Sequence, residues 1–303
     1  MPFTSDQIID RMNLKKQMSN WRIVAVVSIL IIVALIVGSK NFKNVGIKGN
    51  SQYIARLKLE GIIVNDLART EHIKGFAKDR AIKGIILHIN SPGGTVVGGE
   101  NLHTTILELT KTVPVAIVMD DVAASAGYMV ATAGDYIVAH QGTITGSIGV
   151  IAQSFEVVEL ADKLGIKFNT FKSSPLKGGP LPTERMTPAM QDAMNNTIEE
   201  LYNMFVSLVA KRRNIPIETL LPIADGRVYT GQQAFDLKLI DAVGNENTAL
   251  EWLKANKKLA PDIKIIDLDI DPAQDDFNKF FGVLNNLSTT LKMLFNSNLS
   301  YFS

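Results

Sequence analysis

The sequence contains no cysteine and few histidines. Without cysteine, the 303-residue chain forms no disulfide and offers no thiolate to a metal or a substrate. The four histidines, His72, His88, His103 and His140, lie in no recognisable catalytic motif. Lysine and arginine exceed aspartate and glutamate by one, and no basic stripe is present, so the composition does not favour nucleic acid as a partner. Neither a metal nor a cofactor is expected.

One apolar run stands out near the start. Residues 23–38 read IVAVVSILIIVALIVG, without a charged side chain. As a helix this run would be about 24 Å long, slightly shorter than the hydrocarbon core of a bilayer. A cleaved signal peptide is the alternative, but Gly38 and Ser39 match an A-x-A-like cleavage site poorly. We therefore predict an uncleaved single-pass anchor.

The flanking charges and composition predict the organisation of the rest. The basic residues nearest the start favour a cytoplasmic amino terminus, which places the remainder outside the cytoplasm, in the periplasm of a cell with an inner (plasma) membrane. We expect a cytoplasmic segment at 1–21, the anchor at 22–39, a tether at 40–52, a catalytic domain at 53–270 and an amphipathic tail helix at 271–303. The tail helix is expected to lie on a membrane, on a partner subunit or on its own domain.

Strand and helix patterns alternate through the central region. Strands are expected at 53–64, 83–89, 113–120, 136–139, 167–173 and 263–268. Helices are expected at 65–79 with Asn65 as N-cap, at 99–110, at 232–237, at 248–257 and at 187–213 with Thr187 as N-cap. This alternation predicts an α/β fold with mostly parallel strands, whose sites lie at the strands' carboxyl ends.

Two small-residue turns follow predicted strands. Ser125 lies in Ala-Ala-Ser-Ala-Gly-Tyr at 123–128, and Ser-Pro-Gly-Gly occupies 91–94. Such turns can aim backbone N–H groups at one point, as an oxyanion hole requires. A serine nucleophile needs a base, and a neutral lysine can serve. Lys177, in a loop after a predicted strand, is the best candidate, whereas Lys172 is expected to point into solvent. Each motif alone is also typical of ordinary turns and surface charges.

Taken together, the motifs resemble those of the signal peptide peptidase A family, membrane-associated serine proteases with a ClpP/crotonase-like fold. The resemblance covers about 53–244: S-P-G-G at 91–94, D-x-x-A-A-S-x-G-Y at 120–128, T-G-S-I-G-V at 145–150, F-K-S at 171–173, D-G-R-V-Y-T-G at 225–231 and L-I-D-x-x-G at 239–244. Met129 and Lys238 depart from the family pattern, where a second aromatic residue and a glycine are usual.

The resemblance implies a role for each matching residue. Ser125 matches the nucleophile, Lys177 the general base and Ser147 a serine that orients the lysine, while Gly94 and Ala126 would offer backbone N–H groups to the oxyanion. It also implies a homo-oligomer with active sites at subunit interfaces, cleaving remnant signal peptides and other extended hydrophobic peptides. Alternatives are a Ser/Lys protease of the stomatin-cleaving type, a crotonase-like acyl-CoA enzyme and a catalytically silent membrane scaffold.

Overall fold

One mostly parallel sheet organises the computed structural model, which describes residues 52–271. Its eight strands are β1 (Tyr53–Glu60), β2 (Ile82–Ser91), β3 (Val115–Ala124), β4 (Tyr136–Ala139), β5 (Ile144–Gly146), β6 (Val228–Thr230), β7 (Ala242–Val243) and β8 (Lys264–Asp267). The main order is β6-β5-β3-β2-β1-β8. The α/β class predicted from the sequence is therefore confirmed.

Strand β3 pairs with two strands along the same edge. Its first half, 116–119, pairs with β4, and its last residues, 122–124, pair with β5. Both pairings are parallel, whereas β5 and β6 pair antiparallel. The end of β3 thus lies between the ends of β2 and β5, and this is where the candidate site forms.

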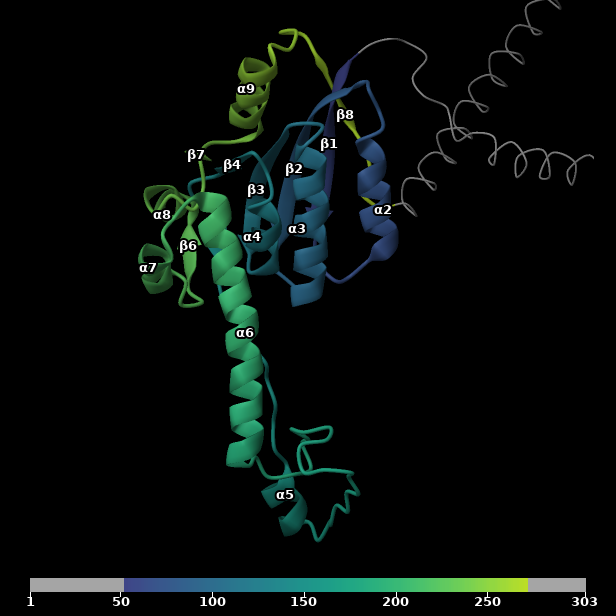
Figure 1. Cartoon of the computed structure of the whole chain (residues 1–303), viewed down its shortest axis with the longest axis vertical. Helices are drawn as coiled ribbons and strands as arrows, with labels where there is room; N and C mark the ends of the chain where they lie inside the picture. Colours follow the sequence, from purple (N-terminus) through teal and green to yellow (C-terminus); the bar gives the residue numbers. More distant parts are fainter. Residues whose placement is uncertain (1–51, 272–303) are drawn as a thin grey trace, which may run out of the picture. The chain divides into compact units, whose positions relative to one another are not determined.

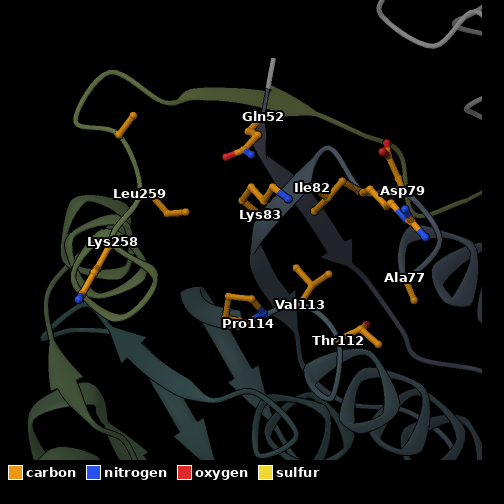
Figure 2. Close-up of a pocket in the computed structure, with 12 residues that line it drawn as sticks. Gln52, Ala77, Asp79, Ile82, Lys83, Thr112, Val113, Pro114, Lys258 and Leu259 are labelled. Atoms are coloured by element: carbon orange, nitrogen blue, oxygen red, sulfur yellow. The ribbon is translucent and has the colours of Figure 1, made fainter. Parts of the chain in front are cut away.

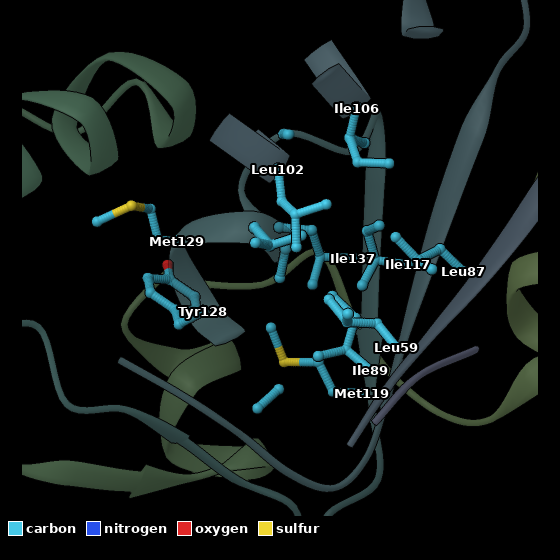
Figure 3. Packing of buried hydrophobic residues seen from close by; sticks show 14 of the residues in the cluster. Leu59, Leu87, Ile89, Leu102, Ile106, Ile117, Met119, Tyr128, Met129 and Ile137 are labelled. Carbon is cyan, nitrogen blue, oxygen red and sulfur yellow. The ribbon is translucent and has the colours of Figure 1, made fainter. Parts of the chain in front are cut away.

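Helices cover both faces of the sheet (Figure 1). Helices α2 (Leu67–Phe76), α3 (Val96–Thr110) and α4 (Ala126–Ala131) follow successive strands, and α3 and α4 pack on the face that carries the larger core. On the other face, α9 (Glu246–Lys257) buries Ala249 and Leu253 against Ile54, Ile86 and Val118. Figure 3 shows the larger core, where Leu102 and Ile106 of α3 meet Leu87, Ile89 and Ile117 of the sheet. Buried on both faces, the central strands are nearly continuous apolar runs.

The longest helix, α6 (Pro188–Arg213), carries a segment away from the sheet. As the sequence predicts for the start of this helix, the Thr187 hydroxyl accepts a hydrogen bond from the Met190 N–H and Pro188 occupies the first turn. Asn214 ends the helix with a backbone in the left-handed region. Its 26 residues span about 39 Å. Only the second half of α6 is buried in the larger core.

Residues 151–187, here called the extension, accompany the first half of α6 (Figure 1). The extension contains α5 (Val158–Lys163), and most of its residues are exposed. Beyond α6 the chain forms α7 (Ile217–Leu220), the 3-10 turn η1 (Leu221–Ile223) and α8 (Gly231–Asp236).

Two local predictions are wrong. Helix α2 is capped by Asp66, whose carboxylate accepts from the Arg69 N–H, because the Asn65 side chain instead accepts from Asn101. No strand forms at 167–173, since that stretch lies in the extension, where the described chain offers no strand to pair with it.

Several predicted segments fall outside the described residues. These are the cytoplasmic segment at 1–21, the anchor at 22–39, nearly all of the tether at 40–52 and all but the first residue of the tail helix at 271–303. Within residues 52–271, no helix is both long and apolar enough to cross a membrane.

Candidate active site

Ser125 occupies the predicted turn between strand β3 and helix α4. Its backbone has φ 53° and ψ −121°, a conformation that residues with a side chain rarely adopt. The Ser125 N–H donates to the Gly146 carbonyl at 2.9 Å, and its carbonyl accepts from the Met129 N–H at 2.9 Å. The hydroxyl does not cap α4. The turn therefore presents a half-buried hydroxyl at the end of the sheet, as a nucleophile elbow does.

The Ser-Pro-Gly-Gly turn after β2 packs directly on Ser125. Gly93 has φ +119°, and a Cβ atom on it would lie 2.8 Å from the Ser125 Cβ and 3.2 Å from its Oγ. The Gly93 N–H donates to the Ser91 hydroxyl at 3.1 Å, which closes the turn. Any side chain at position 93 would thus displace the serine side chain. The sequence did not single out Gly93, because the contact joins two strands.

Gly94 holds the same turn against the loop after β1. It forms an isolated parallel bridge with Ile63, whose N–H donates to the Gly93 carbonyl and whose carbonyl accepts from the Thr95 N–H, both at 2.9 Å. A Cβ on Gly94 would lie 1.9 Å from the Ile63 carbonyl oxygen. Only glycine permits this approach.

Two backbone donors flank the serine turn. Ala126 is the first residue of α4, where a helix has no internal acceptor for its N–H groups. Gly94 is in the adjoining turn, and neither its N–H nor that of Ala126 has a backbone acceptor elsewhere among residues 52–271. Both turns can therefore supply N–H groups to an anion near Ser125.

Ser147 lies next to Ser125 at the end of the neighbouring strand. Ala124 and Gly146 are register partners in β3 and β5, so each serine follows one member of the same pair. Ser147 also has a positive φ of 51°, and its N–H donates to the Arg227 carbonyl at 2.8 Å. The structure thus brings together Gly94, Ser125, Ala126 and Ser147.

Lys177 is not brought to this site within one chain. It is exposed in the extension, where its N–H donates to the Ser174 carbonyl at 3.1 Å. Figure 1 shows the extension reaching α5, at the far end of α6 from α4. Among residues 52–271, the Lys177 amine takes part in no side-chain hydrogen bond or ion pair.

Lys172 is not the solvent-facing side chain that the sequence predicts. Its amine forms an ion pair with the carboxylate of Glu184, and its side chain is only 13% exposed. This pair joins the two ends of the extension's loop. Lys172 therefore holds the loop that presents Lys177.

Other motif residues have structural roles. The Tyr128 hydroxyl, fully buried, donates to the Leu239 carbonyl at 2.8 Å, and burial raises the pKa of this phenol well above its usual range. Asp225 and Arg227 form an ion pair within one exposed turn. That pairing lowers the pKa of the Asp225 carboxyl.

His88 forms a polar cluster that the sequence does not reveal. Its Nδ1 lies 2.9 Å from the Asp120 carboxylate and its Nε2 lies 2.8 Å from the Glu246 carboxylate. Glu246 also accepts from Arg56, and the cluster lies on the α9 side of the sheet. With both ring nitrogens occupied, His88 is no base for Ser125. Glu246 is 158 positions from His88, so no local spacing signals the contact.

No three histidine, aspartate or glutamate side chains within residues 52–271 are grouped to hold a metal ion. The groups that the candidate site brings together are the Ser125 hydroxyl, backbone N–H donors and the Ser147 hydroxyl.

Comparison with known proteins points to the same chemistry. The sequence profile of peptidase family S49 matches residues 108–260. A protein of Synechocystis sp. with a protease name is 34% identical over 221 residues, which cover 72% of this chain and 79% of that protein. A protease-named protein of Methanocaldococcus jannaschii is 40% identical over 177 residues, covering 58% and 57% of the two chains. A protein of Enterococcus faecium with a signal peptide peptidase name is 31% identical over 236 residues, covering 73% and 68%.

The profile match spans both Ser125 and Lys177, and the motif order of the chain agrees with it. A serine at a strained turn beside two backbone N–H donors is also an arrangement suited to peptide hydrolysis. The chain belongs to peptidase family S49, the signal peptide peptidase A family of serine proteases.

Proposed function

We propose that this chain is a membrane-anchored endopeptidase with Ser125 as its nucleophile and Lys177 as its general base. The observation that carries the proposal is the packing of Gly93 on Ser125, which lies in a strained turn between two backbone N–H donors. The family assignment supports peptide hydrolysis and leaves the acyl-CoA alternative without support.

In the proposed reaction, the Ser125 Oγ attacks the scissile carbonyl while the Lys177 amine accepts its proton. The N–H groups of Gly94 and Ala126 stabilise the oxyanion. Lys177 then protonates the leaving amine, and water hydrolyses the acyl-enzyme. Ser147 accepts a hydrogen bond from the lysine amine, which orients it without a carboxylate that would favour the charged form.

We further propose that the lysine comes from a second copy of the chain. The separation of the extension from Ser125 supports this, as do the apolar side chains that the extension exposes. Phe171 is 95% exposed and Ile151 83% exposed. Others exposed in the extension are Phe155, Leu160, Leu164, Ile166, Phe168, Leu176 and Met186. Covering this surface in a homo-oligomer would bury it and would place Lys177 in a drier environment, which favours a neutral amine.

The proposed substrates are remnant signal peptides and other extended apolar peptides. Apolar side chains border the glycine turn: Ile62 and Val64 flank Ile63, the bridge partner of Gly94, and are 70% and 48% exposed. Val97 at the start of α3 is 52% exposed, next to the loop that carries Val64. A peptide laid along this edge would contact aliphatic surface on its way to Ser125. The anchor, with the catalytic domain in the periplasm, would keep the protease at the membrane that holds such peptides.

The decisive experiment mixes two inactive variants. Ser125→Ala and Lys177→Ala should each abolish hydrolysis of a fluorogenic signal-peptide fragment. Co-expressed in equal amounts, they should recover activity, because in a ring about a quarter of interfaces join an intact serine to an intact lysine. If the mixture is as inactive as each variant alone while the oligomer stays intact, the serine and the lysine must act within one chain. Wild-type turnover in either single variant would refute the dyad, and an inert wild-type oligomer would favour a scaffold.

A further inference from the structure

A second polar site lies at the opposite end of the sheet from Ser125. A pocket of about 490 Å³ opens where β1 and β2 begin and β3 is about to begin. Gln52, the first described residue, forms part of its wall, together with Ile82, Val113 and Pro114 (Figure 2). The site described above uses none of these residues.

The charged side chains of this pocket are mostly basic. Arg80, Lys83 and Lys258 line it, against the single carboxylate of Asp79. That carboxylate is already engaged, because it accepts from the Tyr53 hydroxyl at 2.7 Å and from the Ala81 N–H at 2.8 Å. Within residues 52–271, no carboxylate lies within ion-pair distance of the three basic residues.

Lys83 is turned into the pocket by an irregularity of the sheet. Tyr53 pairs with Ile82 and Ile54 pairs with Gly84, so Lys83 is the extra residue of a β-bulge and has no partner on β1. A bulge re-aims a side chain that a regular strand would place elsewhere. In Figure 2 the Lys83 side chain lies between Gln52 and Ile82, and Lys258 lies on the α9 side with its amine turned outward. Lys83, a half-buried residue that lines the pocket, therefore lacks an anionic partner among residues 52–271.

The position of the pocket along the chain indicates the source of an anion. Gln52 ends the predicted tether, which begins right after the predicted anchor at Ser39. Thirteen extended residues span at most about 45 Å, so the pocket stays within that distance of the bilayer surface. Lys78 and Lys111 are the chain neighbours of Ala77 and Thr112, and Lys264 is the first residue of β8, which pairs with β1. Clusters of this kind bind anionic lipid headgroups.

We propose that this basic pocket docks the phosphate of an anionic phospholipid, with Lys83 at its centre and Arg80 and Lys258 at its rim. This proposal rests on the membrane anchor of the proposed function. The tether keeps headgroups at a high effective concentration, so a weak site is occupied. Docking holds the strands' amino ends toward the bilayer and orients the body of each subunit.

The test uses the absence of native cysteine. In the full-length chain, the pocket variant Ala77→Cys is labelled with a fluorophore. The labelled protein is placed in nanodiscs of phosphatidylglycerol or of phosphatidylcholine, and each kind of disc contains a trace of lipid with a spin-labelled headgroup as quencher. Ala193→Cys, exposed on α6, is the reference position. We expect quenching at position 77 in anionic discs to exceed that at position 193 and to fall as salt is raised. Equal quenching in both lipids would overturn the proposal.

Charge variants test whether the lipid-dependent quenching arises at this pocket. Arg80→Glu/Lys258→Glu should weaken lipid-dependent quenching about tenfold or more, and Lys83→Gln should weaken it without reversing a charge. Lys58→Glu/Lys211→Glu changes the net charge equally at exposed positions away from the pocket and should leave quenching unchanged. An equal loss in this control pair would assign the effect to net charge and refute a site.

Two further arms separate other occupants and the anchor itself. Inorganic phosphate, added at constant ionic strength, should not release the labelled pocket from anionic discs. Release would indicate a site for free phosphate, and protection of the thiol in lipid-free detergent would indicate another copy of the chain. Either result overturns the proposal. Failure of the chain to stay in neutral discs at high salt would refute the anchor, whereas retention without charge-dependent quenching would refute the docking alone.

Discussion

Ser125 and Ser147 leave the sheet side by side, because each follows one residue of the Ala124–Gly146 register pair. Both have a positive φ, 53° and 51°, and the Ser125 N–H donates to the carbonyl of Gly146. Two parallel strands thus end in two adjacent, strained serines. A lysine amine that reaches one hydroxyl from this side can hydrogen-bond the other, which is the geometry that the proposed dyad needs.

Replacing Ser125 with glycine should stabilise the protein while abolishing its activity. Glycine adopts the observed backbone conformation without strain, so we expect a gain of about 1 kcal/mol after the entropy cost of glycine is subtracted. The melting temperature should rise by about 2–4 °C in a chain of this size. Ser125→Ala is the matched control, since it removes the hydroxyl and keeps the strain. Equal melting temperatures for the two variants would show that the turn stores no strain.

Replacing Gly94 with alanine should damage both stability and hydrolysis. The new Cβ would lie 1.9 Å from the Ile63 carbonyl oxygen, so the turn that supplies the Gly94 N–H must move. We expect a loss of about 3 kcal/mol, measured by urea unfolding, and a fall in kcat. Gly142→Ala is the control, because nothing lies within 4 Å of its Cβ position. If the two variants behaved alike, the close packing of the glycine turn would be wrong.

Replacing Lys172 with methionine should loosen the extension without removing the base. The change leaves the Glu184 carboxylate, 21% exposed, without its partner, at a cost of about 1–2 kcal/mol. Hydrogen exchange should quicken at 167–187, whereas the shape of the pH–rate profile should stay that of the wild type. Lys177→Met should instead abolish turnover and leave exchange unchanged. If Lys172→Met, and not Lys177→Met, lost the alkaline limb of the pH–rate profile, Lys172 would be the base in place of Lys177.

The local part of the site is readable from the sequence because it depends on neighbours in the chain. Small residues around Ser125, after an apolar run, predict a strand-to-helix turn, and the structure contains it. Thr187 and Pro188 likewise predict the start of α6. The contact of Gly93 with Ser125 is not readable in this way, because it depends on the pairing of β2 with β3.

Errors arise where competing partners decide the outcome. Asn65 and Asp66 are both good helix caps, and the choice between them depends on Asn101, which engages Asn65 from another helix. The β-like run at 167–173 predicts a strand, but a strand needs a neighbour, and the extension provides none within the described chain. Lys172 looks solvated in the sequence because its partner Glu184 is brought near only by the loop.

Replacing His103 with leucine should remove part of the acid sensitivity of the fold. Burial, with the Arg212 guanidinium nearby, lowers the pKa of this histidine to about 4. Its Nε2 is buried without a hydrogen-bond partner. A lowered pKa means that stability is complete above the unfolded-state value of about 6.5 and declines as pH falls toward 4, by about 2 kcal/mol between pH 7.5 and pH 5. Unfolding of His103→Leu should show a decline smaller by this amount, and an unchanged decline would contradict the assignment.

His88 should produce the opposite pH dependence. Burial disfavours its charged form, but hydrogen bonds and charge from Asp120 and then Glu246 outweigh burial and raise the pKa of His88 above its ordinary value. Arg56 and Asp267 complete the charged groups around it, because Arg56 bonds both Glu246 and Asp267.

A raised pKa means that the stabilisation is complete below about pH 6.5 and is lost as pH rises through the folded-state value. The melting temperature of His88→Asn should therefore fall furthest below that of the wild type in mildly acid buffer, and the gap should narrow in alkaline buffer. His140→Asn, which changes an exposed histidine outside the cluster, is the control. A gap for His88→Asn that widened with pH would mean that the two carboxylates are held by something other than an imidazolium. In that case Arg56 would have to neutralise Glu246 alone, and α9 would lose its charged link to β3 in every condition.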